Sequence, residues 1–171
     1  MIDDGLRKAA TKVLALCRAR GLEIATAESC TGGLVAAALT AIAGSSDVVD
    51  RGFVTYSNAA KQAMLGVPAA TLKRHGAVSA ETAAAMAAGA LKNSRADLSV
   101  AITGVAGPGG GTKEKPVGLV YFAASRRDGR QVARSRRYGK IGRTRVRQRS
   151  VAEALALLQL LAEEVRAAKV T

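Results

Sequence analysis

Aromatic residues are scarce in this sequence, and tryptophan is absent. Aromatics make up 3% of the 171 residues, whereas hydrophobic residues make up 49%. The interior therefore has to be built mainly from Ala, Val, Leu and Ile, whose modest side chains let layers of secondary structure approach closely. This composition favours a compact α/β sandwich. The length is typical of one domain, which we expect to span residues 1–171.

Cysteine and histidine are also rare. Cys17 and Cys30 are too few for a disulfide framework or for a zinc site built from thiolates. His75 is the single histidine, which argues against a metal site that depends on several imidazole ligands. These absences predict a reduced, cytoplasmic setting and no bound metal.

Long apolar runs are missing as well. No stretch reaches the roughly 20 apolar residues that cross a bilayer. The opening residues MIDDGLRKAA lack the apolar centre of a secretory signal. We therefore expect no signal peptide and no association with a membrane.

Negative charge is in short supply, and the net charge is +13. Eleven basic residues fall between Arg126 and Arg149, where only Asp128 opposes them. Such a segment attracts nucleic acid or an anionic small ligand, and the alternative is a solvated basic face. Because aromatic side chains for base stacking are few, a nucleic-acid-binding module is the less favoured interpretation.

The apolar periodicity predicts alternating helices and strands. Helices are expected over residues 3–20, 34–43, 57–66, 68–74, 79–93 and 144–168, and strands over 22–27, 48–56, 98–102, 117–124 and 131–138. Asp128 and Gly129 form a hairpin signal, which requires one antiparallel pair of strands. The sequence therefore predicts an α/β fold with a mixed sheet.

The stretch TAESCTGG, Thr26 to Gly33, lies where a predicted strand passes into a predicted helix. Either Ser29 or Cys30 could be a nucleophile there, and free backbone N–H groups at a helix start could hold a developing oxyanion. The alternative is that these hydroxyls only cap the helix. The stretch alone does not separate the two interpretations.

Two further strand ends carry polar or glycine residues, and ligand sites of α/β sheets gather at such ends. Tyr56 ends one strand, and Lys61 follows about one helical turn later. A lysine can act as a general base when burial or nearby cations lower its pKa, and Tyr56 could relay the proton. His75, the only residue that could complete a Ser-His-Asp set, is interpreted as structural.

The second of these strand ends is the glycine-rich stretch TGVAGPGGG, Thr103 to Gly111. It lacks the Gly-Lys-Ser/Thr ending of a phosphate-binding P-loop and the spacing of a dinucleotide-binding loop. Its glycines would still let backbone N–H groups approach a ligand closely.

Five motifs, in their order and spacing, resemble the C-terminal domain of the competence-damage protein CinA: TAESCTGG, IAGSSDVVDRGFVTYSNAAK, HGAVS, TGVAGPGGG and KPVGLVYFA. The resemblance covers about Leu6 to Ala162. It implies a three-layer α/β/α sandwich, similar to anticodon-binding domains, with a mixed five-stranded sheet in which one strand runs antiparallel to the rest.

Stand-alone members of that family are nicotinamide-nucleotide amidohydrolases. The resemblance therefore implies hydrolysis of nicotinamide mononucleotide to nicotinate mononucleotide and ammonia, within pyridine nucleotide salvage and without a metal or other cofactor. The expected partner is this small nucleotide. Two rival functions are a basic nucleic-acid-binding module and a catalytically silent regulatory domain, and a homo-oligomer is left open.

By the motif match, Ser29 is the nucleophile, with Tyr56 and Lys61 as its activating partners, and Cys30 is the disfavoured rival. Glu28 either orients Lys61 or caps the helix, and N–H groups of residues 30–32 are expected to hold the oxyanion. The substrate phosphate is expected at Ser45 and Ser46, at the glycine loop, or at Arg143. The full set of expected substrate contacts is Glu28, Cys30, Thr31, Gly32, Gly33, Ser45, Ser46, Thr103, Gly104, Gly107, Pro108, Gly109, Gly110 and Arg143.

Overall fold

The computed structural model describes residues 1–166 and contains one five-stranded sheet in the order β2-β1-β3-β4-β5. The strands are β1 (Ile24–Glu28), β2 (Val49–Val54), β3 (Leu98–Gly104), β4 (Leu119–Arg126) and β5 (Gln131–Arg137). β1 runs parallel to β2 and β3, whereas β4 is antiparallel to both of its neighbours. The predicted mixed sheet with one reversed strand is therefore confirmed.

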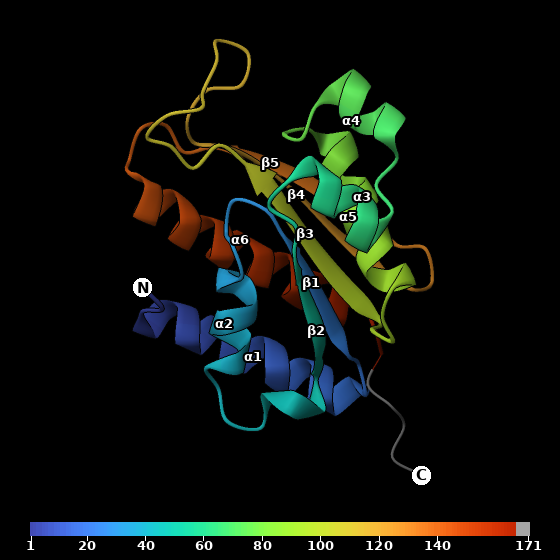
Figure 1. Ribbon diagram of the computed structural model, residues 1–171. Coiled ribbons are helices and arrows are strands. Elements are labelled where there is room, and N and C mark those ends of the chain that lie inside the picture. Colours follow the sequence, from blue (N-terminus) through green and yellow to red (C-terminus); the bar gives the residue numbers. More distant parts are fainter. Residues whose placement is uncertain (167–171) are drawn as a thin grey trace.

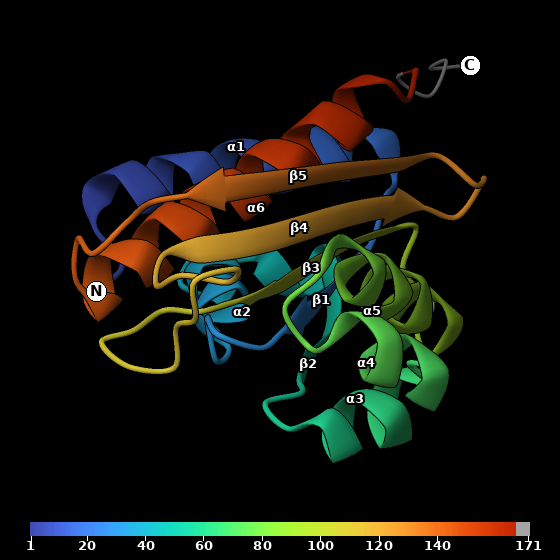
Figure 2. The same cartoon turned by 90° about the horizontal axis from the view of Figure 1, so that it is seen from above.

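Helices cover both faces of the sheet, which gives the three layers expected (Figure 1). One layer consists of α1 (Asp4–Arg20), α2 (Leu34–Thr40) and α6 (Arg143–Glu163). The other consists of α3 (Asn58–Leu65), α4 (Ala69–His75) and α5 (Ala80–Lys92). Figure 2 shows the sheet between α1 and α6 on one side and α5 with α4 on the other. A short 3-10 helix, Ser45–Asp47, precedes β2.

Each face of the sheet has its own apolar core. Leu14, Leu39, Phe122 and Leu155 are buried on the α1–α6 side. The α5 side is built largely from alanines around Met86, as the composition predicts. Gly89 shows how closely α5 packs against the end of α3 within this layer, because a Cβ at this position would lie 2.0 Å from the Leu65 carbonyl oxygen. The central strand β1 is buried along its whole length, as is usual for a parallel strand covered on both faces.

The predicted helix ends follow the local capping chemistry. Gly21 closes α1 in the left-handed conformation, and the Ser57 and Ser79 hydroxyls accept backbone N–H groups at the starts of α3 and α5. The last helix is shorter than predicted and ends at Glu163, where Arg20 donates to the Val165 carbonyl. Residues 167 and 168 of that prediction lie outside the described residues.

The topology brings three of the sequence motifs to one edge of the sheet. Because β1, β2 and β3 are parallel, their carboxyl ends lie side by side. The chain leaves β1 towards α2 on one face, and it passes from β2 to β3 through α3, α4 and α5 on the other face. Ligand sites in α/β sheets form where connections diverge in this way.

Candidate active site

A cavity of about 300 Å³ opens at this edge of the sheet. It is lined by Ser29, Cys30, Tyr56, Lys61, Ala77, Val78, Thr103, Gly104, Val105, Ala106, Gly107, Gly109, Gly110 and Arg143. Three other hollows are larger: two, of about 400 and 510 Å³, lie beside α1 and contain no serine or cysteine, and one, of about 320 Å³, lies at the turn between β4 and β5, where Ser125 has no lysine, histidine or carboxylate beside it in the lining. The smaller cavity is the one in which a nucleophile and a base meet.

Ser29 and Lys61 contact each other directly in this cavity. The Lys61 Nζ lies 3.0 Å from the Ser29 Oγ and donates a second hydrogen bond to the Thr55 carbonyl at 2.9 Å. Only 1% of Lys61 is exposed, and this burial lowers the pKa of its amine, although a charge on Cys30 would oppose the shift. A neutral amine that donates to Thr55 keeps a lone pair with which to take the Ser29 proton.

The surroundings of Cys30 disfavour the reactive form of its side chain, whereas those of Lys61 favour the neutral amine. Its thiol is buried, and this burial raises its pKa to about 12, with the neighbouring Glu28 charge acting in the same direction. The thiolate is the nucleophilic form of cysteine, so a thiol with this pKa is inert near neutral pH. The local chemistry therefore favours Ser29 over Cys30.

Glu28 caps the helix that follows the nucleophile. Its buried carboxylate accepts hydrogen bonds from the N–H groups of Gly33, Val35 and Ala36 at 2.9–3.1 Å. Among the described residues, it makes no hydrogen bond with Lys61. The capping alternative for Glu28 therefore agrees with the structure, and the orienting alternative does not.

The backbone of the turn after β1 is almost completely hydrogen-bonded. The Ser29 N–H donates to Ile102, and the Gly32 N–H donates to the Ser29 carbonyl. Within residues 1–166, the N–H groups of Cys30 and Thr31 donate to no acceptor. The expected set of oxyanion donors, residues 30–32, is thus reduced to the first two, because Gly32 is already engaged.

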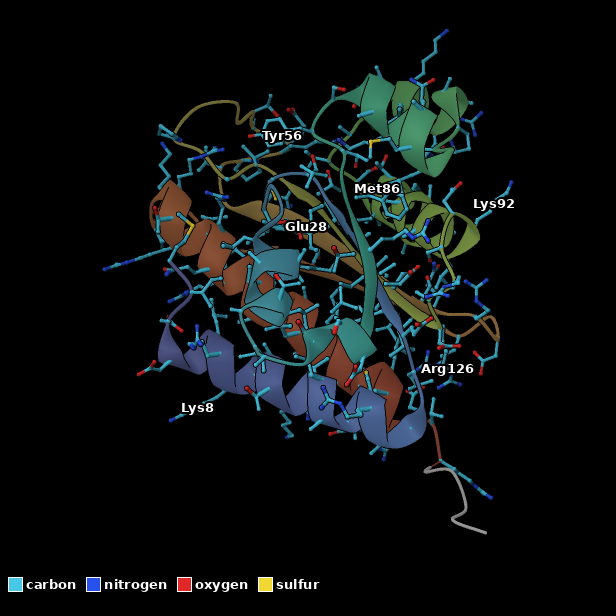
Figure 3. The ribbon with its side chains drawn as sticks, turned by 60° about the horizontal axis from the view of Figure 1, so that its bottom comes forward. Lys8, Glu28, Tyr56, Met86, Lys92 and Arg126 are labelled. Atoms are coloured by element: carbon cyan, nitrogen blue, oxygen red, sulfur yellow. The ribbon has the colours of Figure 1, made fainter. Side chains whose placement is uncertain are left out.

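Tyr56 does not lie between Ser29 and Lys61, as a proton relay would require. Its hydroxyl accepts a hydrogen bond from Arg143 at 3.0 Å, and 61% of the residue is exposed. Figure 3 shows Tyr56 among the outer loops, whereas Glu28 lies at the end of the sheet. Lys61 reaches the Ser29 hydroxyl without an intermediate group, which favours direct proton transfer over a relay through Tyr56.

Arg143, the first residue of α6, forms hydrogen bonds with two different walls of the cavity. It donates to the Gly107 carbonyl at 2.8 Å as well as to the Tyr56 hydroxyl. In the described part of the chain, the N–H groups of Ala106, Gly107, Gly109 and Gly110 have no acceptor. A guanidinium beside several free N–H groups is suited to an anion.

Some expected contacts lie away from the cavity. Ser45 and Ser46 precede β2, and the Ser45 carbonyl accepts the N–H of Val48, which pairs with the start of β1. They therefore lie at the opposite end of the strands from Ser29, and their expected contact with the substrate is wrong. The remaining residues that do not line the cavity are Glu28, Thr31, Gly32 and Gly33, which build the turn, and Pro108, which is exposed in the loop.

Sequence reasoning missed one wall of the cavity. Ala77 and Val78 line it, and the Thr103 hydroxyl donates to the Ala77 carbonyl at 2.7 Å. Both residues belong to the HGAVS motif, and the match of this motif to the family was the feature of the sequence that could have identified them. Val105 and Ala106 also line the cavity and lie within the glycine loop, but they were not among its expected contacts.

Several arginines of the basic segment have partners within the described part of the molecule. Arg126 and Arg130 pair with Glu164, and Arg134 and Arg136 pair with Glu153. Arg127 donates to the carbonyls of Leu91, Ser94 and Ala96, while Arg143 and Arg147 contact the site described above. These arginines are thus used within the fold, which leaves fewer of them for the nucleic-acid-binding alternative.

Two general features of the described chain bear on its surroundings. Among residues 1–166, no helix is both long and apolar enough to span a bilayer. In the same part of the chain, His, Cys, Asp and Glu side chains do not gather in threes as a metal site would require.

The layers and the strand order define an α/β/α protein in which a serine and a buried lysine contact each other at the carboxyl ends of its parallel strands. Comparison with known families agrees with the resemblance in the motifs. The chain belongs to the CinA C-terminal domain family, whose sequence profile matches residues 6–162.

Relatives of two lengths are found among known proteins. The nicotinamide-nucleotide amidohydrolase PncC of Escherichia coli K12 is 49% identical over 158 residues, which cover 92% of this chain and 95% of that protein. A CinA-like protein of Parasynechococcus marenigrum is 51% identical over 157 residues, and the chain spans only 37% of its length. The chain spans 28% of a putative competence-damage inducible protein of Caldicellulosiruptor bescii, with 53% identity.

Solved structures share the whole fold. The competence/damage inducible protein CihA of Agrobacterium tumefaciens superposes with a TM-score of 0.93 at 52% identity, covering 95% of this chain and 98% of the other. A competence or damage-inducible protein of Enterobacter asburiae gives a TM-score of 0.86 at 36% identity, with 92% and 98% covered.

Glu28→Gln should destabilise the protein by about 1–3 kcal/mol, because one amide oxygen cannot replace a carboxylate that accepts three buried N–H groups. Thermal unfolding should show a Tm lower by about 3–10 °C. The exposed Glu114→Gln is the matched control and should leave the Tm unchanged. An unchanged Tm in Glu28→Gln would contradict the capping role.

Lys61→Met removes the buried amine and keeps much of its volume. Since the pKa of Lys61 is lowered below 10.5 by burial, the unfolded chain binds its proton more tightly than the folded chain. The free energy of unfolding of the wild type should therefore rise relative to Lys61→Met as the pH increases from the lowered pKa towards 10.5. Urea denaturation of both proteins across this interval measures the difference, and a constant difference would refute the shift.

Proposed function

We propose that this protein hydrolyses the carboxamide of nicotinamide mononucleotide to give nicotinate mononucleotide and ammonia. The observation that carries the proposal is the contact of 3.0 Å between Lys61 Nζ and Ser29 Oγ inside a cavity. It is supported by 49% identity to a relative of about the same length that is named a nicotinamide-nucleotide amidohydrolase.

In the first half of the reaction, the neutral Lys61 amine takes the Ser29 proton while Oγ bonds to the carboxamide carbon. The electron pair of the carbonyl moves to its oxygen, which the free N–H groups of Cys30 and Thr31 stabilise. Collapse of this tetrahedral species breaks the C–N bond, and Lys61 returns the proton to the departing ammonia. An ester of Ser29 with the nicotinate carbonyl remains.

In the second half, a water molecule takes the place of ammonia. Lys61 accepts a proton from this water as its oxygen attacks the ester carbon, and the same two N–H groups hold the oxyanion. The bond between Ser29 Oγ and the acyl carbon then breaks, and Oγ regains the proton from Lys61. The products are a carboxylate, a proton and the restored serine.

Tyr56 is assigned a role at the rim of the cavity in this scheme. Its hydroxyl is held by Arg143, and its ring lines the cavity that would receive the substrate. Because Lys61 contacts Ser29 directly, Tyr56 is expected to orient the substrate and not to carry the proton from Ser29.

The substrate phosphate is placed between Arg143 and the glycine loop. Of the three alternatives left open by the sequence, Ser45 and Ser46 lie at the other end of the strands, whereas the loop and Arg143 are bonded to each other through the Gly107 carbonyl. Free N–H groups of the loop and the remaining guanidinium N–H groups would share the phosphate oxygens.

Ser29→Ala should reduce ammonia release from nicotinamide mononucleotide by at least about a thousandfold, because the nucleophile is lost. Lys61→Ala should cause a loss of similar size, since base and nucleophile act as a unit. The exposed Ser135→Ala is the control for serine removal. Near-normal ammonia release by Ser29→Ala would refute the proposal.

Arg143→Ala should weaken selection for the phosphate. The preference for nicotinamide mononucleotide over nicotinamide riboside, measured as the ratio of kcat/KM values, should fall by about ten- to a hundredfold, as loss of a charge-assisted hydrogen bond predicts. Arg137→Ala removes an exposed arginine from the end of β5 and should leave the ratio unchanged. Equal losses for both substrates in Arg143→Ala would show that the arginine does not bind the phosphate.

A further inference from the structure

Arg147 lies on α6, in the layer of helices behind the turn that contains Ser29, and its side chain reaches this turn. It lies one helical turn after Arg143 on α6, which packs against α2. Its Nη2 donates to the Thr31 carbonyl at 3.0 Å, and the same oxygen accepts the Leu34 N–H at 3.1 Å. Arg147 thus fixes one peptide group of the turn from outside the turn itself.

The charge of Arg147 has no carboxylate partner within the described chain. None of the ion pairs among residues 1–166 includes this guanidinium, in contrast to Arg130, Arg134 and Arg136 of the same basic segment. Its Nε is buried and has no hydrogen-bond acceptor there. A partly buried, uncompensated cation costs desolvation energy, and it favours negative charge on nearby groups.

The effect of this cation is directed at the position where the reaction would create negative charge. Its Nη2 would lie 3.6 Å from a Cβ built on Gly32, so the guanidinium lies directly against the turn. Arg147 and Arg143 both act to lower the pKa of Cys30, although burial outweighs them. A cation that stabilises a negative charge at Cys30 would also stabilise an oxyanion held by the Cys30 N–H.

We propose that Arg147 is a positioning residue for acyl transfer at Ser29: it holds the Thr31 carbonyl and so fixes the turn whose Cys30 and Thr31 N–H groups would hold the oxyanion, and it places a positive charge behind that oxyanion. The role rests on the proposed acylation of Ser29. It requires no contact between Arg147 and the substrate, and Arg147 does not line the cavity. Its contribution is therefore made in the transition state and not in substrate binding.

Three variants test this role: Arg147→Met, Arg147→Lys and, as the control on the same helix, Arg145→Met. Arg145 is exposed and lines a separate hollow beside α1. With nicotinamide mononucleotide, Arg147→Met should lower kcat by about ten- to a hundredfold, as slight misplacement of catalytic groups does, with KM changed less than about twofold. Arg147→Lys keeps the charge on a different geometry and should recover part of the loss.

A second measurement does not depend on the identity of the substrate. A fluorophosphonate probe forms a bond from phosphorus to the Ser29 Oγ with loss of fluoride, and its phosphoryl oxygen occupies the oxyanion position. The labelling rate of Ser29 should fall by a factor similar to that in kcat in both Arg147 variants and should be unchanged in Arg145→Met. If the wild type labels but releases no ammonia from nicotinamide mononucleotide, the proposed substrate fails while the role of Arg147 is still measured.

Several outcomes would overturn the role. An increase in KM at constant kcat would place Arg147 in ground-state binding. If the Tm is lower but kcat and the labelling rate, both measured below the unfolding range, are unchanged, the role of Arg147 is purely structural. If Arg147→Met does not fold, the folded Arg147→Lys variant still tests the role. A wild-type kcat and labelling rate in that variant would refute the requirement for the guanidinium geometry. A wild type that is not labelled at Ser29 would remove the role together with the nucleophile.

Discussion

The burial of one lysine amine against a serine hydroxyl is the constraint on which this structure depends. Lys61 is held by the Thr55 carbonyl, and the Thr55 N–H in turn bonds to the carbonyl of Glu28, the residue before Ser29. The ends of β1 and β2 and the start of α3 are therefore joined in one hydrogen-bonded unit. An amine removed from water is costly to charge, so the same packing that positions Lys61 also prepares it as a base.

Most of the helices and strands could be predicted from the sequence, because the signals for helix ends and for the hairpin are local. Capping residues such as Ser57, Ser79 and Gly21 predicted helix ends, and the pair of Asp128 and Gly129 predicted the antiparallel hairpin. The order of the strands was not predicted, because it depends on pairing between segments far apart in the sequence. Helix length was overestimated at the C-terminal end of α6, where apolar spacing continues beyond the last helical residue.

The site was predicted less completely, because spacing does not specify where a side chain points. Strand ends placed Ser29 and Lys61 at one edge, and the structure brings them into contact. The same reasoning could not tell that Tyr56 turns outward to Arg143. The predicted strand 48–56 already placed Ser45 before its strand, so the expected contact of Ser45 with the phosphate was at odds with the strand-end argument. Glu153, which pairs with Arg134 and Arg136 of β5, and Glu164, which pairs with Arg130 before β5, are also far along the chain, and no local pattern reveals these pairs.

The pairing of arginines with glutamates along β5 limits the width of the sheet. β5 is an edge strand whose backbone would otherwise offer a template for a further strand. Arg134 and Arg136, held in place by Glu153, keep charged and hydrated groups along this edge. Strand addition there would require these groups to lose water and come close to like charges. The ion pairs with Glu153 thus place on this edge strand the kind of charged groups by which natural sheets disfavour pairing with another chain.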